Sequence, residues 1–533
     1  MERLAGKVML LWGVRRMVLA VAAGAIGALA LPPFNIFGVL FVSFTFLVWL
    51  MDGLASHPDG GFLSRLRASF FLGWLFGFGY FVAGLWWLGN ALLVEADEFA
   101  WAIPLAVLGL PAFLALFYGL ATAIAALLWS DGFARLAALA LGFGTAEWLR
   151  SFIATGFPWN AVGYGAMPVP VMMQSAGVIG LFGVTTLAVL VFSVPSLFGT
   201  RRGLTSGLII GALLLVVHCG YGIFRLNLVL DEPGGQLTVV RLVQPVLDQS
   251  RKLEKSDRAR IFEEHLALSR TPPKAGGRRP DIIVWPETSV PFLLTESQDA
   301  LVKIAEMLDE GQVLVAGAVR AEYGDPGSAT RYYNSVYVID DEGQILAASD
   351  KVHLTPFGEY VPFEDSLRGW GIDNLVSLPG GFTAAAVRSL LVLPDGRKLY
   401  PLICYEAIFP QEISAEIGNS DAILNITNDA WFGNTPGPYQ HFQQARLRAV
   451  ETGLPLIRGA NSGISALVDP FGRVVAGMGF NQKGFLDASW VEMRVPSWSP
   501  FVRTACFTLI LISMFLVAAI ARIGFGTRHY PFR

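Results

Sequence analysis

Three residues that could carry out nucleophilic chemistry each follow a short apolar stretch in the second half of the chain. Glu287 follows DIIVWP, Lys351 follows QILAASD, and Cys404 ends LYPLIC. A thiol becomes a strong nucleophile when it loses its proton, and a carboxylate within hydrogen-bond reach can take that proton. An ammonium beside both can stabilise the oxyanion that develops on an attacked carbonyl. Brought together, the three side chains would supply a base, an electrostatic clamp and a nucleophile, and the product would be a thioester.

These side chains can meet only if the stretches before them belong to one layered domain. Short runs rich in Val, Ile and Leu predict strands at 237–244, 281–285, 313–319, 333–340, 344–350, 399–404 and 421–427. Helical patterns lie between them at 252–270, 296–310 and 438–452. Strands that alternate with helices indicate an α/β domain, in which ligand sites gather beyond the carboxyl ends of strands.

Each of the three residues also has a structural interpretation. A lone Cys near a strand end is more often buried filler, and a Glu or Lys in a loop is usually solvated. The surrounding motifs WPETS, SDKVHLTPFGEY and CYE are unlike ordinary solvent loops and favour a chemical role. The chain has no CxxC pair, so zinc and thioredoxin-like sites lack their ligand spacing.

The composition shows two populations of residues. The chain has 533 residues, of which 53% are hydrophobic and 15% charged, whereas soluble domains average roughly 25% charged. Residues 231–495 carry 24 Lys and Arg against 34 Asp and Glu, a net charge of −10, and the remainder carries 15 against 8, a net of +7. An acidic domain argues against nucleic acid as a partner, because phosphate binding needs clustered Lys and Arg.

The remainder is apolar enough to enter a membrane, since a spanning helix needs roughly 20 apolar residues. Eight candidate spans run over about 14–31, 35–51, 69–92, 101–129, 133–153, 171–199, 205–224 and 503–523. The second is short and the fifth contains Glu147 and Arg150. We therefore predict a seven-helix transmembrane domain over 1–230, a catalytic domain over 231–495, and a last transmembrane helix with a cytoplasmic tail over 496–533.

The positive charges predict the orientation of these spans. One set of connections and both termini carry twelve Lys and Arg, whereas the alternate connections, 32–34, 93–100 and 154–170, carry none. Because positively charged connections stay in the cytoplasm, both termini should be cytoplasmic and residues 231–495 should lie on the outer side of the membrane, which in a Gram-negative bacterium is the periplasm.

The order Glu, Lys, Cys in these motifs resembles the nitrilase superfamily of amidases and acyltransferases. Residues 440–472, which include RAVETGLPLIRGANSGISALVDPFG, resemble the later core of that superfamily. With seven preceding spans and one following, the resemblance narrows to the apolipoprotein N-acyltransferase family and covers essentially the whole chain. It implies an αββα sandwich for the soluble domain.

The resemblance also implies a reaction at a bacterial inner membrane. That family transfers an acyl chain from a phospholipid to the α-amino group of the N-terminal diacylglyceryl cysteine of an apolipoprotein. Cys404 would attack the lipid ester, Glu287 would be the general base, and Lys351 would support the charges in a ping-pong cycle. The implied partners are the phospholipid, the apolipoprotein and the bilayer; no metal or soluble cofactor is implied, and we expect a monomer.

Other residues are expected to support this site. The resemblance suggests that Glu359 and Glu406 order it, with a plain ion pair or loop hydrogen bond as the alternative. Asn334 and Arg458 are expected to support the core loops, and Tyr405 to pack beside the thiol. The remaining candidates for a Cys–His enzyme, His353 and His441, fit ordinary polar packing better.

Two long aromatic segments, 356–383 and 428–441, contain glycines of the kind found in lids. We expect Phe357, Trp370 and Trp431 to gate lipid entry, with a small hydrophobic cluster under the loops as the alternative. Two other functions stay open: a membrane-tethered amidase acting on a small substrate, and a transporter or assembly scaffold. The spans show no pair of broken helices in matching halves, which disfavours the transporter.

Overall fold

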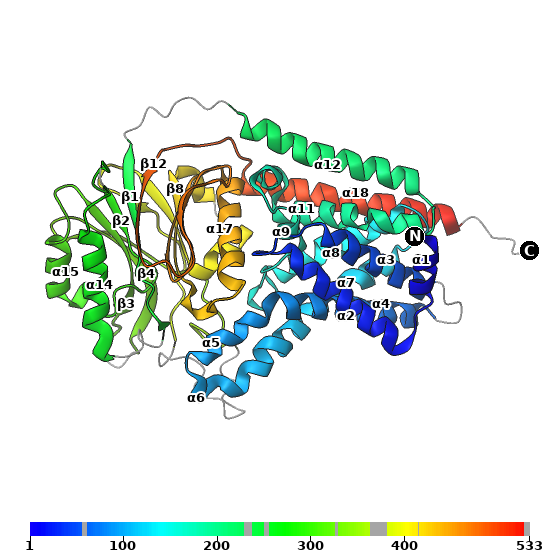
Figure 1. Cartoon of the computed structure of the whole chain (residues 1–533), viewed down its shortest axis with the longest axis horizontal. Helices are drawn as coiled ribbons and strands as arrows, with labels where there is room; N and C mark the ends of the chain where they lie inside the picture. Colours follow the sequence, from blue (N-terminus) through cyan, green and yellow to red (C-terminus); the bar gives the residue numbers. More distant parts are fainter. Residues whose placement is uncertain are drawn as a thin grey trace, which may run out of the picture. The chain divides into compact units, whose positions relative to one another are not determined.

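The computed structural model describes residues 1–55, 61–228, 237–249, 255–274, 276–325, 329–362, 381–413 and 415–526. The chain forms two compact units (Figure 1). One unit consists of Met1–Leu228 with Ser497–Arg533, and the other consists of Val229–Pro496.

The first unit is helical. Within the described residues, six of its segments are long and apolar enough to cross a membrane: Gly13–Ala30, Phe62–Leu93, Ala96–Leu127, Ala176–Gly199, Leu204–Leu226 and Pro500–Ile523. They are built on α2 (Gly13–Gly27), α4 (Phe62–Leu85), α7 (Leu110–Leu127), α11 (Ala176–Ser193), α12 (Leu204–Leu226) and α18 (Pro500–Gly526). The other two predicted spans correspond to α3 (Val39–Ala55) and α8 (Ala134–Arg150), which have 17 residues each. The first unit therefore has the composition of a membrane protein.

Helix α8 carries charge into the interior of this bundle. It packs against α7, α11 and α18. Its Glu147 and Arg150 form an ion pair with fully buried side chains, Tyr118 Oη donates to Glu147 Oε1 at 2.8 Å, and Arg150 Nη1 donates to the Trp159 carbonyl at 2.9 Å. Polar groups inside a bundle are tolerated when they satisfy one another in this way.

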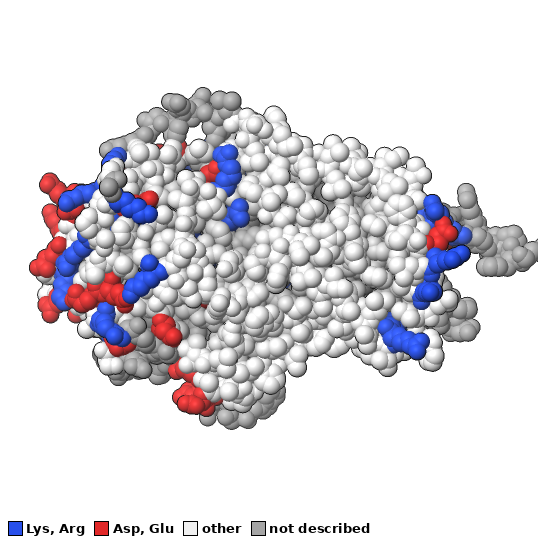
Figure 2. Space-filling view, viewed as in Figure 1, with Lys and Arg blue, Asp and Glu red and all other residues white. Residues whose placement is uncertain are grey.

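Exposed charges of the helical unit gather where its helices begin and end. Arg201, just before α12, pairs with Glu2 of α1 (Glu2–Met9), and Arg202 pairs with Asp131 just before α8. In Figure 2 the surface of the helices is largely white; blue and red atoms lie near the N-terminus, and further red atoms lie at α6 (Ala96–Phe99). This distribution suits helices whose sides face lipid and whose ends face water.

The described residues of the second unit form two six-stranded sheets. The first has the order β12-β1-β2-β3-β4-β5, with β1 (Thr238–Gln244), β2 (Ile282–Val284), β3 (Val313–Glu322), β4 (Arg331–Ile339), β5 (Ile345–Asp350) and β12 (Gly484–Trp490). The second has the order β11-β10-β9-β8-β7-β6, with β6 (Leu391–Val392), β7 (Lys398–Ile403), β8 (Ala422–Asn428), β9 (Leu456–Asn461), β10 (Ser465–Val468) and β11 (Val474–Met478).

The sheets pack face to face with helices outside, as in an αββα sandwich. Alternate residues of a strand point to opposite faces, so Ile282 and Val284 enter the core between the sheets, whereas Ile283 packs outward. On the outer face of the first sheet lie α14 (Arg258–Arg270) and α15 (Gln298–Ala305), and on that of the second lies α17 (Gly437–Thr452) (Figure 1). This four-layer arrangement explains why the strands are apolar on both faces.

All seven predicted strands are present. The three predicted helices of this unit are present too, with α14 and α15 shorter than expected; residues 252–254 of the first prediction lie outside the described residues. The other five strands, β6, β9, β10, β11 and β12, were not predicted from the sequence. Glycines interrupt or begin most of these strands, as in LIRGAN, VVAGM and GFLDASW, and mask their apolar pattern. Their pairing comes from distant parts of the chain: β12 pairs antiparallel with β1.

Candidate active site

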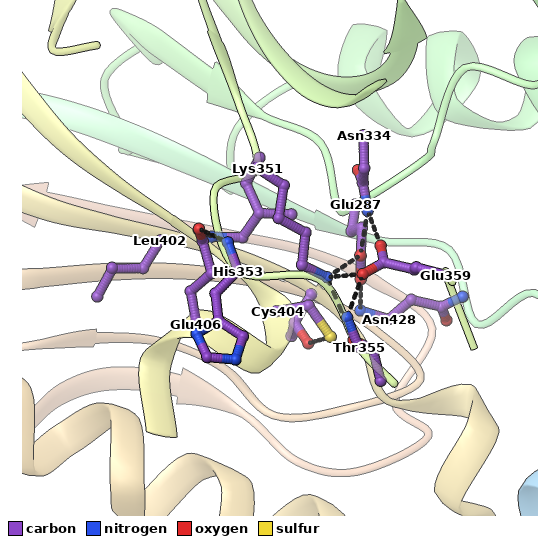
Figure 3. Close-up of polar contacts among 12 residues, drawn as sticks. Glu287, Asn334, Lys351, His353, Thr355, Glu359, Leu402, Cys404, Glu406 and Asn428 are labelled. Carbon is purple, nitrogen blue, oxygen red and sulfur yellow. Dashed lines mark hydrogen bonds and ion pairs between the residues drawn. The ribbon is translucent and has the colours of Figure 1, made fainter. Parts of the chain in front are cut away.

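The topology brings the three candidate catalytic residues to the same edge of the sandwich. Strand β2 is parallel to β3, and β5 runs in the same direction because two antiparallel pairings separate it from β3. Glu287, three residues after β2, and Lys351, directly after β5, therefore lie beyond the same edge of the first sheet. Cys404 directly follows β7 of the facing sheet, and Figure 3 shows its sulfur near the other two side chains.

Lys351 lies between two carboxylates. Its Nζ is 2.9 Å from Glu359 Oε2 and 3.6 Å from Glu287 Oε1, and its side chain is 1% exposed. The amide of Asn334 joins the same two carboxylates, because its Nδ2 donates to Glu287 Oε1 and to Glu359 Oε1, both at 2.7 Å. The backbone N–H of Thr355 donates to Glu359 Oε2 at 2.7 Å. The predicted supporting residues Glu359 and Asn334 thus hold the Lys and Glu in place (Figure 3).

The second sheet also holds Glu287. The backbone N–H of Asn428, the last residue of β8, donates to Glu287 Oε2 at 3.0 Å. Each carboxylate oxygen of Glu287 therefore accepts a hydrogen bond from a different sheet. This arrangement fixes the orientation of the carboxylate and links its position to the packing of the two sheets.

The backbone is strained on both sides of the site. Cys404 has a φ of +51°, Thr288, next to Glu287, has a φ of +45°, and Phe357 has a φ of +60°. Positive φ is uncommon in residues other than glycine and is a clear outlier for a β-branched residue such as Thr. Such strain persists only where the surrounding structure enforces it, and it is concentrated at functional sites.

Burial, together with the negative charge of Glu287, favours the protonated form of the resting Cys404 thiol. Burial raises the pKa of Cys404, and the negative charge of Glu287 raises it further. Lys351 opposes both, but the net pKa lies well above the ordinary value of a thiol. For Lys351, burial alone would lower the pKa, but Glu359 and Glu287 outweigh burial and raise it. Because Lys351 is already protonated, it cannot take the proton of the thiol. The thiol must therefore lose its proton during attack to another base within reach.

Glu406 joins the Cys404 turn to the Lys351 loop. Its Oε2 accepts from the backbone N–H of Ile403 at 2.7 Å, and its Oε1 accepts from that of Val352 at 2.8 Å. Arg388 Nη2 also donates to Oε1 at 2.7 Å, which balances the charge of a side chain that is 1% exposed. Glu406, the second predicted ordering residue, therefore connects the segments that carry the nucleophile and the ammonium.

A further buried cluster lies beside Cys404. Asp429, in the one-turn helix η12 (Asp429–Phe432) after β8, accepts from Arg458 Nη2 at 2.9 Å and lies 2.8 Å from His441 Nδ1. His441 Nε2 lies 3.1 Å from the Cys404 carbonyl oxygen, and Thr427 Oγ1 lies 3.2 Å from the Cys404 sulfur. Arg458 was predicted as a supporting residue, but Asp429 and Thr427 were not. Their position at the end of a strand, in NITNDAW, was the available signal.

The remaining predicted residues lie around this core. Tyr405 is buried and stacks edge-on against Phe409, at a centroid distance of 5.0 Å. His353 stacks on Phe409 at 4.0 Å and pairs with Glu412, in agreement with polar packing. Among the predicted gate residues, Phe357 is 57% exposed, Trp431 is half-buried in η12, and Trp370 lies outside the described residues.

Each of the two units matches the model of a known protein family. The carbon-nitrogen hydrolase family model matches residues 239–496, and the model of the apolipoprotein N-acyltransferase N-terminal domain matches residues 23–194. Apolipoprotein N-acyltransferases of Rhizobium rhizogenes and Agrobacterium fabrum are 62% and 60% identical to this chain, each over 99% of it and 100% of their own length. Among solved structures, an amidase from Nesterenkonia sp. is similar over 50% of this chain and 94% of its own, at 18% identity and a TM-score of 0.34, which is too distant to add to the assignment.

The two family models together match most of the chain, and the two relatives match it over nearly its full length at 60% identity or more. These matches agree on one family. The chain belongs to the apolipoprotein N-acyltransferase family.

Proposed function

We propose that this protein transfers an acyl chain from a phospholipid to the N-terminal diacylglyceryl cysteine of an apolipoprotein, through a thioester on Cys404. Family membership supports the overall reaction. The observation that supports the mechanism is the buried position of Lys351 between Glu287 and Glu359, in electrostatic contact with Cys404.

In the first half-reaction, the Cys404 sulfur attacks the ester carbonyl while its proton moves to the Glu287 carboxylate. The negative charge that develops on the carbonyl oxygen is stabilised by Lys351, which cannot itself act as the base because its charged neighbours keep it protonated. When the intermediate collapses, the ester C–O bond breaks and Glu287 returns the proton to the departing lysophospholipid. The acyl group is left on sulfur as a thioester.

In the second half-reaction, the α-amino group of the apolipoprotein attacks the thioester. Glu287 takes a proton from the attacking nitrogen, the C–S bond breaks, and the sulfur regains a proton. A buried carboxylate held by Asn334 and the Asn428 N–H can accept and return protons without changing its position. The same three side chains thus serve both half-reactions, with no resident metal or cofactor in the scheme.

The membrane arrangement in this proposal keeps eight spans, with α3 and α8 as the second and fifth. Both termini are then cytoplasmic, and residues 231–495 lie in the periplasm. The ion pairs Arg201–Glu2 and Arg202–Asp131, and the bond from Arg522 Nη1 to the Trp129 carbonyl at 3.1 Å, connect segments that this topology assigns to the cytoplasmic end. Reporter fusions after residues 60 and 200 should report the cytoplasm, and a fusion after residue 275 the periplasm; the reverse pattern would contradict the topology.

Mass spectrometry of the peptide that contains Cys404 tests the reaction. After incubation of the full-length protein with phospholipid vesicles, we expect this peptide to gain the mass of one acyl chain, and to lose it when a diacylglyceryl cysteine peptide is added. The Cys404→Ser and Cys404→Ala variants should transfer no acyl chain. Acyl transfer by the Cys404→Ala variant would refute the role of Cys404 as the nucleophile. Hydrolysis of small amides, with no acyl mass on the Cys404 peptide, would favour the amidase alternative.

A further inference from the structure

The hydroxyl of Thr427 lies between the sulfur of Cys404 and a buried carboxylate. Thr427 Oγ1 is 3.2 Å from Cys404 Sγ and 3.0 Å from Asp429 Oδ1, and both Thr427 and Asp429 are completely buried. The position follows from topology: β7 and β8 are parallel neighbours, so the residues at their carboxyl ends lie side by side. A hydroxyl has one hydrogen to donate and can also accept a hydrogen bond. The Thr427 hydrogen can therefore point to only one of these two neighbours at a time.

Asp429 accepts hydrogen bonds and donates none. Burial alone would raise the pKa of Asp429, but the charges of Arg458 and His441 lower it below the ordinary value. An ionised carboxylate offers only acceptor sites. While Cys404 is a thiol, the hydrogen of Thr427 therefore points to Asp429, and the S–H group can donate to the free side of Thr427 Oγ1.

We propose that Thr427 is a further catalytic residue. Its Oγ1 accepts a hydrogen bond from the S–H group of resting Cys404, and its own hydroxyl hydrogen turns to the sulfur as negative charge develops there. This inference rests on the proposed role of Cys404 as nucleophile. The change requires rotation of two hydrogens: the S–H turns from Thr427 to the Glu287 carboxylate, and the hydroxyl hydrogen turns from Asp429 to the sulfur. Asp429, still held by Arg458 and His441, keeps two of its hydrogen bonds when Thr427 turns away.

The charges that face the sulfur show why this hydrogen bond matters. Glu287, beyond β2, and Asp429, in η12, are negative and disfavour a thiolate. Lys351, beyond β5, and the Thr427 hydrogen bond favour it. His441, on α17, places its Nε2 3.1 Å from the Cys404 carbonyl oxygen. Thr427 therefore assists the anionic sulfur together with Lys351, which also serves the two carboxylates.

The rate of Cys404 alkylation tests this role without any lipid substrate. The full-length protein in detergent is treated with iodoacetamide between about pH 6 and pH 10, a range that spans the ordinary thiol pKa, and labelling of the Cys404 peptide is measured by mass spectrometry. Thr427→Val keeps the shape of the side chain and removes the hydroxyl. We expect it to slow labelling about tenfold at a given pH and to move the pH profile upward by about one unit, as the loss of a hydrogen bond to a charged group should do.

Two controls separate this effect from a structural one. Thr427→Ser keeps a hydroxyl and should restore the wild-type profile. Thr452→Val removes a buried hydroxyl that bonds to the Arg448 carbonyl on α17, away from the sulfur, and should leave the profile unchanged. If Thr427→Val does not fold, Thr427→Ala provides the same comparison.

A wild-type pH profile in Thr427→Val or Thr427→Ala would overturn the proposal, as would an equal shift in Thr427→Ser. Because alkylation needs no phospholipid, failure of the acyl-transfer function would appear separately, as the absence of an acyl mass on Cys404.

Discussion

Replacing Gly317 with Ala should displace the proposed base without touching any of its hydrogen-bonding groups. Gly317 lies in β3, where its carbonyl accepts from the backbone N–H of Ser289 at 2.9 Å and braces the turn that carries Glu287. A Cβ at this position would lie 2.5 Å from the Pro286 carbonyl oxygen and 2.7 Å from the Glu287 Cα. Ordinary contacts begin at 3.4 Å, and the obstructing atoms are backbone, so the turn must move by about 0.7 to 0.9 Å.

A displacement of that size is large for catalysis and small for folding. Misplacement of a catalytic group by about 1 Å can cost on the order of 100-fold in rate. We therefore expect Gly317→Ala to form the acyl-enzyme roughly 100 times more slowly than the wild type, measured as the acyl mass gained by the Cys404 peptide over time. The protein should still fold, because strain from one added methyl group in a packed site typically costs about 1–3 kcal/mol.

Gly418→Ala is the matched control, because a Cβ there meets no atom within 4 Å. It should react at the wild-type rate and melt at the wild-type temperature. A wild-type rate of acyl-enzyme formation in Gly317→Ala would refute the reasoning, since it would mean that the position of Glu287 does not limit the reaction. A large loss of melting temperature in Gly317→Ala would attribute the slower rate to unfolding.

Three further predictions follow from the same geometry. Glu406→Gln keeps the size of the side chain but places an amide N–H against the groups that donate to it, so denaturant unfolding should show a loss of about 3 kcal/mol and slower acyl-enzyme formation; unchanged stability would contradict its connecting role. Burial would raise the pKa of Asp429, but Arg458 and His441 lower it below 3.8, so its carboxylate stabilises the fold above that pH and the benefit is lost as the pH falls through the lowered value. Asp429→Asn should therefore be less stable than the wild type at neutral pH, with a difference that narrows below pH 3.8, and a gap that is independent of pH would contradict this. Phe357→Ser should lower turnover with phospholipid vesicles, while the melting temperature and the iodoacetamide labelling of Cys404 stay unchanged. Trp370→Ser should have the same effects. Unchanged turnover in both variants would contradict the lipid-gate hypothesis.

Several supporting residues were predicted from the family resemblance, and the structure shows what each of them contacts. Glu359 and Glu406 stand near the Lys and Cys motifs in the sequence, which does not say what each one binds. In the structure Glu359 holds the ammonium of Lys351, whereas Glu406 holds backbone N–H groups and Arg388. The difference arises because the Glu359 side chain contacts Asn334, Lys351 and the Thr355 N–H, whereas that of Glu406 crosses from the Cys404 turn to the Lys351 loop.

The sequence by itself determined the apolar helices, the seven strongest strands and the three candidate residues that follow three of them. These features depend on local composition and on the period of the side chains, which can be read along the chain. The tertiary structure alone decided which groups meet at the site: Asn334 between two carboxylates, the Asn428 N–H on Glu287, and Thr427 between a thiol and an aspartate. Such contacts depend on strand order, register and the packing of two sheets, because a hydrogen bond requires its two atoms to lie within about 3 Å, and no spacing along the chain fixes that distance.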